Sequence, residues 1–271
     1  MNMRFFDGDL PYFGFDAFLE LPFIKHMFTT RRGGVSQGYY KSLNLKSGLS
    51  DPETNVRENF NRVAGAMGCR AEDLVLTDQT HTARVIAVGE SDRGAGLIKE
   101  RGYHDVDGLV TDTKGLVLSV FSADCLPLIF ADPVKKCIGA AHSGWRGSVK
   151  KIALNTIKAM QENYGSDPAD IICGIGPAIC GNCYEVSDEV AEEFEAVFPD
   201  KADQILRRNR PGHFLLDLKR AVAITMNEAG VRKDNIHISD ICTCENPDLL
   251  FSHRASHGKR GVQGAFIMIR D

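Results

Sequence analysis

Three residues that are far apart in the chain are the first candidates for chemistry. His81 stands in LTDQTHTARV, Cys125 in FSADCLPLIF and His142 in GAAHSGWRG, each at or near the end of an apolar stretch. Two histidines and one cysteine are the ligand type of an open catalytic zinc site, in which the fourth position is left for water or substrate. The hypothesis requires the fold to bring these three side chains together.

The segment from residue 115 to residue 147 predicts how two of these side chains are positioned. It reads as a strand, a connection that contains Cys125, a second strand, a tight turn, a third strand that ends at His142, and a loop that opens a helix. Pro127 limits backbone pairing and favours an irregular strand entry beside Cys125. Two neighbouring strands would thus present both side chains at one end of a sheet. At the helix N-terminus, Arg146 could complete a phosphate site.

Composition and charge narrow the class of protein. With 271 residues, 43% hydrophobic and 25% charged, the chain is expected to form one soluble globular domain over residues 1–271. A net charge of -4 argues against binding of nucleic acid, which needs a basic face. The N-terminal residues do not form a signal peptide, and no run reaches the roughly 18 apolar residues of a membrane span. We therefore expect a cytoplasmic protein.

Reduced thiols are expected in that compartment, so the eight cysteines are interpreted as packing, metal-binding or reactive residues before disulfides. Cys180-x-x-Cys183 with Cys242-x-Cys244 could form a four-thiolate zinc cluster, although the second spacing is tighter than usual. The chain contains no HExxH, GxxxxGK[ST], complete GxGxxG or GxSxG motif, and no HxE element of a zinc deaminase.

Hydrophobic periodicity predicts a mixed α/β protein. Four helices are expected, at residues 51–68 with Asp51 as N-cap, at 147–165, from Ser187 onward, and at 217–230. Strands are expected at residues 75–76 continuing into 84–88, and at 106–111, 115–121, 126–130, 137–141, 171–175, 236–238 and 264–269. Because several strands follow one another without helices, a layered mixed α/β sandwich fits better than an alternating barrel or dinucleotide fold.

Seven motifs, in this order, give the chain a specific resemblance. They are TTRRGGVSQGYYKSLNL, QTHTARV, DVDGLVTD, SADCLPLIF, AAHSGWRG, GIGPAICGNCYEV and FSHRASHGKRG. The whole chain resembles the laccase-domain or peptidoglycan-editing-factor family, also described as multifunctional purine nucleoside phosphorylases. The resemblance implies a single-domain, four-layer αββα sandwich with mixed sheets, shared with cysteine-hydrolase-like toxins. It also implies a metal held by His81, Cys125 and His142, the residues that ligand chemistry selects.

The activity implied by the resemblance is phosphorolysis of adenosine, inosine and methylthioadenosine, together with adenosine deamination. Zinc on the three ligands would lower the pKa of a bound water for deamination, and the expected partners are a small-molecule nucleoside and phosphate. Asp124, beside the cysteine ligand, could orient a ligand or act as general base. Candidates for substrate binding are arginines for phosphate and an asparagine for ribose or base; these are Arg31, Arg146, Arg254 and Asn44.

Three alternative functions remain open. A copper-dependent polyphenol oxidase would use the same ligand types, but the His-x-His pairs of a multicopper cluster are absent from the sequence. A cysteine-dependent amidase that edits peptidoglycan precursors would use Cys125 as nucleophile, with His142 or His81 as base. A zinc ion that only stabilises the fold would need four protein ligands. The physiological substrate, the metal in the cell and the oligomeric state stay open.

Overall fold

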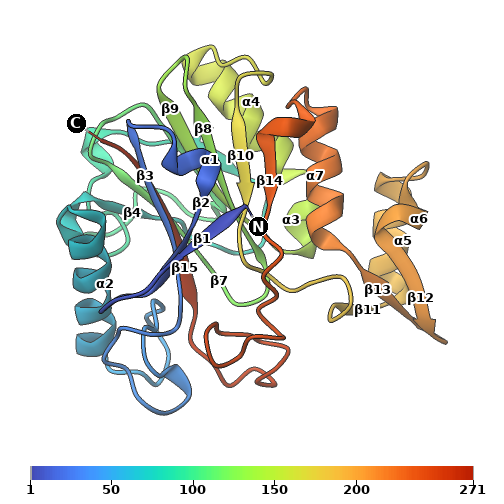
Figure 1. Cartoon of the computed structure of the whole chain (residues 1–271), viewed down its shortest axis with the longest axis horizontal. Coiled ribbons are helices and arrows are strands. Elements are labelled where there is room, and N and C mark those ends of the chain that lie inside the picture. Colours follow the sequence, from blue (N-terminus) through green and yellow to red (C-terminus); the bar gives the residue numbers. More distant parts are fainter. Residues whose placement is uncertain (1, 271) are drawn as a thin grey trace.

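The computed structural model describes residues 2–270 and contains two six-stranded sheets (Figure 1). The first sheet has the order β1 (Met3–Phe6), β2 (Tyr12–Phe15), β3 (Ile24–Thr29), β15 (Gln263–Ile269), β7 (Val117–Ser122) and β4 (Leu74–Leu76). The second has the order β14 (Ile236–Ile238), β10 (Ile172–Ile175), β8 (Leu126–Asp132), β9 (Cys137–Ser143), β6 (Gly108–Thr111) and β5 (Val85–Ala87). Both sheets are mixed, since the β4–β7, β5–β6 and β10–β14 pairs are parallel and the other pairs are antiparallel.

Three apolar clusters show that the sheets and helices form four layers. Between the sheets, Leu118 and Ile267 of the first pack in one cluster with Ile129 and Ala140 of the second. Helix α2 (Glu53–Met67) covers the outer face of the first sheet. Helices α4 (Ile152–Tyr164) and α7 (Leu218–Glu228) cover the outer face of the second. The predicted αββα sandwich is therefore confirmed.

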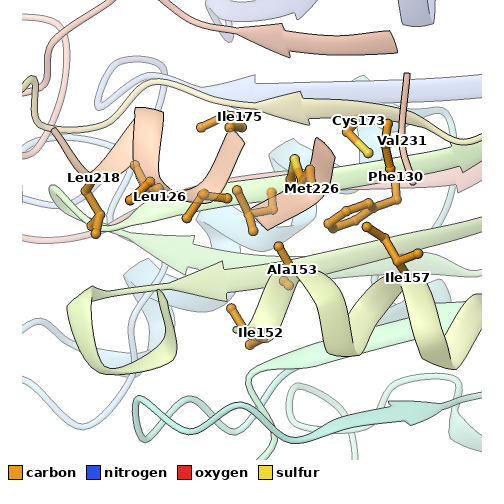
Figure 2. Close-up of a cluster of buried hydrophobic side chains, with 14 of the residues drawn as sticks. Leu126, Phe130, Ile152, Ala153, Ile157, Cys173, Ile175, Leu218, Met226 and Val231 are labelled. Atoms are coloured by element: carbon orange, nitrogen blue, oxygen red, sulfur yellow. The ribbon is translucent and has the colours of Figure 1, made fainter. Parts of the chain in front are cut away.

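The third of these clusters fixes the strands that carry the candidate site. Figure 2 shows Leu126 and Phe130 of β8 packed with Ile157 of α4 and Met226 of α7. All seven residues of β8 are buried, because this strand lies inside the second sheet and has an apolar layer on each face. A strand buried on both faces reads as a continuous apolar run, which is why the sequence identified it.

The other elements include a small part of the fold that the sequence analysis missed. A three-stranded sheet of order β11-β13-β12 lies to one side of the sandwich with α5 and α6 (Figure 1). The remaining bounds are α1 (Asp16–Leu19), α3 (Trp145–Val149), α5 (Asp188–Val197), α6 (Ala202–Ile205), β11 (Glu185–Ser187), β12 (Leu206–Arg210), β13 (His213–Leu216) and the 3₁₀ turns Gly38–Tyr40, Ala71–Asp73, Glu90–Asp92 and Lys233–Asn235. Among residues 2–270, no helix is both long enough and apolar enough to cross a membrane.

Two helix predictions need correction at their N-termini. The predicted helix at 147–165 is two helices, α3 and α4, because Lys151 between them adopts a left-handed φ of 57° that breaks the hydrogen-bond ladder. Helix α2 begins after Pro52 and not after Asp51. The Asp51 carboxylate turns inward and accepts hydrogen bonds from Ser36 Oγ and Asn44 Nδ2 at 2.6 and 2.8 Å.

The predicted strand that continues from residue 76 to residue 84 is also wrong. Strand β4 belongs to the first sheet and β5 to the second, so the residues between them form a loop that crosses from one sheet to the other. The N-terminal prediction for α5 is confirmed, since Ser187 is its cap. The prediction for α7 is confirmed as well, because the Asp217 carboxylate accepts from the backbone N–H of Arg220.

His26 on β3 gives the fold a defined sensitivity to acid. Its side chain is 3% exposed, and its Nε2 accepts a 2.8 Å hydrogen bond from the backbone N–H of Phe15, which requires the neutral ring. Burial, with a smaller effect of the Arg270 charge, lowers the pKa of His26 from 6.5 to about 3. Between these values the unfolded chain binds a proton that the folded chain does not. The contribution of neutral His26 to the free energy of unfolding is therefore fully present above pH 6.5, and it is lost progressively as the pH falls toward 3.

We expect His26 to lower the free energy of unfolding by about 2 kcal/mol between pH 7 and pH 5. Urea denaturation of the wild type and of His26→Gln at both pH values measures this difference, because the carboxyl groups titrate alike in the two proteins. An equal pH dependence in both proteins would contradict the prediction.

Candidate functional site

The three predicted metal ligands converge. Cys125 is the last residue before β8 and His142 lies near the end of β9, where Pro127 pairs with His142 in the antiparallel ladder. His81 comes from the loop between β4 and β5. One donor atom from each of the three side chains lies within 4.8 Å of the others, and the two imidazole centroids are 5.0 Å apart. The fold therefore brings together the three side chains, as the hypothesis of a metal site requires.

A buried carboxylate that the sequence analysis did not single out orients two of the ligands. Asp107, just before β6, accepts a 2.8 Å hydrogen bond from His142 Nδ1, which leaves Nε2 of that ring for a metal. The same carboxylate accepts from the backbone N–H groups of Thr80, His81 and Thr82 at 3.0, 3.3 and 2.9 Å. It thus holds the loop in which His81 has a left-handed φ of 63°. The sequence signal that could have identified Asp107 is an acidic residue directly before a buried apolar strand.

The electrostatics favour ionised partners at this centre. Burial raises the pKa of the Cys125 thiol, but the charge and hydrogen bonds of His142 and then His81 outweigh it and lower the pKa to about 6. Burial opposes protonation of His142, whereas the Cys125 thiolate and the Asp107 carboxylate raise its pKa to about 9. A cysteine that is readily deprotonated between two imidazoles is a good donor for a borderline-soft cation. The donor set therefore fits zinc, and it also fits copper.

A cleft of about 460 Å³ opens beside the three side chains. Its cationic lining consists of Lys46, Arg101 and Arg260, and its apolar lining includes Leu45, Phe60 and Phe121. Nε of Arg260 is buried and has no hydrogen-bond partner within the part of the chain that the structure describes. The cleft thus combines a wall of candidate metal donors, cationic groups and aromatic faces, which suits an anionic reactant together with a flat heterocycle.

Asp124 lies next to Cys125 but serves the surrounding loops. Its left-handed φ of 90° makes it the corner of the connection into β8. One carboxylate oxygen accepts from Thr243 Oγ1 at 2.6 Å and the other from the backbone N–H of Arg254 at 2.7 Å. This placement matches an orienting role for Asp124, since the carboxylate fixes the loop that presents Cys125.

The four predicted substrate-binding residues do not line the cleft. Arg31 donates to the carbonyls of Lys41 and Pro247, and Arg254 donates to those of Cys183 and Glu185. The exposed Arg146 stacks on Trp145, with its guanidinium carbon 4.2 Å from the ring centroid. Asn44 is fully buried and fixes the backbone of Lys46 and Val262. Asn44 thus supports the loop that lines the cleft. The cationic residues that do line it, Lys46, Arg101 and Arg260, were not predicted from the sequence.

A second group of possible metal donors lies on the loops after β10 and β14. Donor atoms of Cys180, Cys183, Cys242 and Glu245 lie within 4.8 Å of one another. The sequence suggested Cys244 as the fourth donor of this cluster, whereas the structure places Glu245 in that position. Residues 243–245 form a turn, and the Cys244 thiol lies near Cys183 without belonging to this group of four donors.

Gly144 packs closely against two of the candidate metal ligands. A Cβ at this position would lie 2.8 Å from Cδ2 of His81 and 3.1 Å from Sγ of Cys125, although its φ of -78° would accept alanine. We expect Gly144→Ala to weaken zinc binding by at least about tenfold, because overpacking of roughly 1–3 kcal/mol falls on the ligands. A zinc competition titration measures this. Gly65→Ala is the matched control, since a Cβ there meets open space, and equal zinc affinities for the two variants would contradict the prediction.

Comparisons to known proteins agree with the fold. Residues 25–270 match the family model described as multi-copper polyphenol oxidoreductase laccase. The chain therefore belongs to this laccase-like family, as the resemblance of its motifs indicated.

Relatives within this family carry the name purine nucleoside phosphorylase. One is purine nucleoside phosphorylase YlmD of Bacillus subtilis, which is 38% identical over 248 residues, covering 90% of this chain and 88% of the relative. The crystal structure of YlmD from Geobacillus stearothermophilus has a TM-score of 0.92 at 34% identity and covers 98% of this chain and 99% of that chain. A Bacillus licheniformis hypothetical protein YfiH gives the same TM-score and coverage at 33% identity.

Proposed function

We propose that this protein is a zinc-dependent purine nucleoside phosphorylase that acts on adenosine, inosine and methylthioadenosine and also deaminates adenosine. The observation that carries the proposal is the three-donor centre of His81, Cys125 and His142 at the wall of a cleft with cationic and aromatic lining. Relatives named purine nucleoside phosphorylase support it. Zinc held by these donors would supply Lewis-acid activation of an oxygen in the cleft.

The residues of the chain meet the other demands of phosphorolysis. In this reaction a phosphate oxygen forms a bond to C1′ of the ribose, the glycosidic C–N bond breaks, and its electron pair leaves with the base. Arg260, with its free buried Nε, and the cations Lys46 and Arg101 bind and orient the phosphate, since guanidinium groups match phosphate oxygens. The apolar side of the cleft receives the purine, with Phe121 as the aromatic contact.

A panel of nucleosides tests the function. Protein of measured zinc content is incubated with adenosine, inosine and methylthioadenosine, with and without phosphate, and the products are separated by chromatography. We expect free base only when phosphate is present, together with ribose 1-phosphate from adenosine and inosine and 5-methylthioribose 1-phosphate from methylthioadenosine. In the absence of phosphate we expect inosine from adenosine. Release of base that does not depend on phosphate would reject phosphorolysis. Oxidation of a phenol by copper-loaded protein, without turnover of any nucleoside, would favour the copper alternative.

Arg260 is expected to determine the affinity for phosphate. Because a charge-assisted hydrogen bond contributes about 1.5–3 kcal/mol, Arg260→Gln should raise the KM for phosphate roughly 10-fold to 100-fold with a small change in the KM for nucleoside. Initial rates at varied phosphate measure this, and Arg57→Gln, on the exposed face of α2, is the control. A raised KM in Arg146→Gln but not in Arg260→Gln would instead assign phosphate to the position predicted from the sequence.

A second candidate function has its own geometric support. Cys125 lies beside His142, whose Nδ1 is held by Asp107 at 2.8 Å, which is the order of nucleophile, base and orienting acid in a cysteine hydrolase. In an amidase the Cys125 sulfur would attack the amide carbonyl and His142 would protonate the leaving amine. A chelator distinguishes the two functions, because it should abolish zinc-dependent phosphorolysis and spare hydrolysis of a cell-wall amide by a free thiol.

A further inference from the structure

The thiols on the loops after β10 and β14 form a cluster that the proposed reaction does not use. Cys180 and Cys183 are half-buried, Cys242 is buried and Glu245 is exposed. Oε1 of Glu245 lies 3.8 Å from Sγ of Cys180 and 3.6 Å from Sγ of Cys183. Three sulfurs and one carboxylate oxygen thus lie within 4.8 Å of one another, and Glu245 is the exposed member of the group.

The backbone of both loops is arranged to hold these side chains together. The N–H of Cys183 donates to the carbonyl of Cys180 at 3.0 Å, so the Cys-x-x-Cys segment forms a tight turn with both thiols on one side. Ala178 and Cys242 form a parallel bridge between the loops. The N–H of Cys180 donates to Sγ of Cys242 at 3.3 Å, and such a bond stabilises a thiolate that serves as a ligand.

We propose that Cys180, Cys183, Cys242 and Glu245 bind a structural zinc ion at a site separate from the cleft. Zinc prefers four tetrahedral ligands in structural sites, and two cysteines spaced as Cys-x-x-Cys are a common pair among them. Binding releases the three thiol protons to solvent and involves no change of oxidation state. Unlike the centre at His81, this site has a full set of four protein donors and no position for a substrate.

The surroundings of the cluster suit its charge. Three thiolates and one carboxylate carry four negative charges, and a divalent cation leaves an excess of two. Lys219 of α7 is 7% exposed, and its Nζ donates to the carbonyls of Ser239 and Ile241 at 2.7 and 3.0 Å. Ile241 precedes Cys242, so a buried ammonium lies beside the ligand loop. It offsets part of the excess charge.

The same loops position the segment that carries Cys125. The backbone N–H of Ile179 donates to the carbonyl of Asp124 at 3.0 Å, and Thr243 and the backbone N–H of Arg254 bind its carboxylate. Ile179 is adjacent to the ligand Cys180, and Thr243 is adjacent to the ligand Cys242. Zinc at this site therefore joins two loops that would otherwise be held by few hydrogen bonds, and it stabilises the corner before β8.

Elemental analysis of purified protein tests the proposal without reference to activity. The wild type should contain two zinc ions per chain. A His81→Ala and Cys125→Ala background, which lacks the ligands of the cleft, should retain one. Adding Cys183→Ser to that background should remove it, and adding Glu245→Gln, a change on an exposed side chain, should weaken zinc at least tenfold in a chelator competition. Adding Cys69→Ser is the control, since Cys69 belongs to neither donor group, and it should retain the zinc.

Three results would overturn the second site. The first is a background protein that contains no zinc although circular dichroism shows it to be folded. The second is a disulfide among these cysteines, detected by intact mass in protein purified under reducing conditions. The third is zinc in the background that survives both Cys183→Ser and Glu245→Gln. Because the deciding measurements use the background that lacks the cleft ligands, failure of the proposed nucleoside reaction would not affect this result.

Discussion

Replacing Cys125 with serine is expected to abolish phosphorolysis while leaving the fold intact. Serine is nearly isosteric with cysteine but is a poor ligand for a borderline-soft cation, so the centre between His81 and His142 loses the one negatively charged donor among its three ligands. Because a metal contributes several kcal/mol to stabilisation of a transition state, we expect kcat/KM to fall at least about 10³-fold. The zinc bound at the cleft should fall in parallel.

The measurement combines kcat/KM for inosine with zinc content per chain. Cys69→Ser is the control, since this half-buried cysteine belongs to neither donor group. Wild-type turnover in a Cys125→Ser protein that lacks zinc at the cleft would contradict the zinc-dependent reaction. Loss of turnover with full zinc content would instead indicate that the Cys125 sulfur acts on the substrate itself.

Asp107→Asn is expected to have the second largest effect, on metal affinity and on stability together. Asp107 is fully buried, and hydrogen bonds from His142 and the backbone lower its pKa against the opposing effect of burial. An amide would turn an N–H₂ group toward a donor, which leaves polar groups unsatisfied. We expect zinc affinity to weaken about 10-fold to 100-fold and the free energy of unfolding to fall by about 1–3 kcal/mol.

A chromophoric chelator gives the zinc affinity, and urea unfolding of zinc-free protein gives the stability. Asp105→Asn is the matched control, because Asp105 is exposed and has a left-handed φ of 54° that asparagine accepts. Its carboxylate accepts from Thr80 Oγ1 of the same loop, while its other contacts with Thr82 and Asp78 use the backbone and survive the change. Equal effects of the two changes would show that Asp107 does not orient the ligands.

The convergence of the three candidate ligands could be predicted from the sequence because their signal is chemical and local. His81, Cys125 and His142 each stand at or near the end of an apolar run. Because β8 and β9 are joined by a short turn, their pairing follows from chain order. Asp107 could not be selected in this way. Its role depends on an antiparallel pairing of β6 with β9 and on the loop from the other sheet, neither of which the local sequence specifies.

The substrate-binding predictions show the same limit. Arg31, Arg146 and Arg254 were chosen by residue type within distinctive motifs, but the backbone carbonyls and the aromatic ring that engage their guanidinium groups come from the tertiary structure. Arg260 faces the cleft because the chain turns there into β15. The three-stranded sheet was missed for another reason: β12 reads as the polar segment LRRNR, whose four charged or polar residues are exposed.

The position of β15 has a consequence for the order in which the molecule is completed. This strand, the last in chain order, lies between β3 and β7 and pairs with both. During synthesis the two earlier strands therefore have no partner on their facing edges until residues 263–269 leave the ribosome. Contacts between segments so distant in the chain form slowly. Arg260 and Val262 of the cleft come just before β15, so the nascent chain completes this cleft only after its other strands have been synthesised. Until β15 pairs, the facing edges of β3 and β7 stay exposed and prone to association.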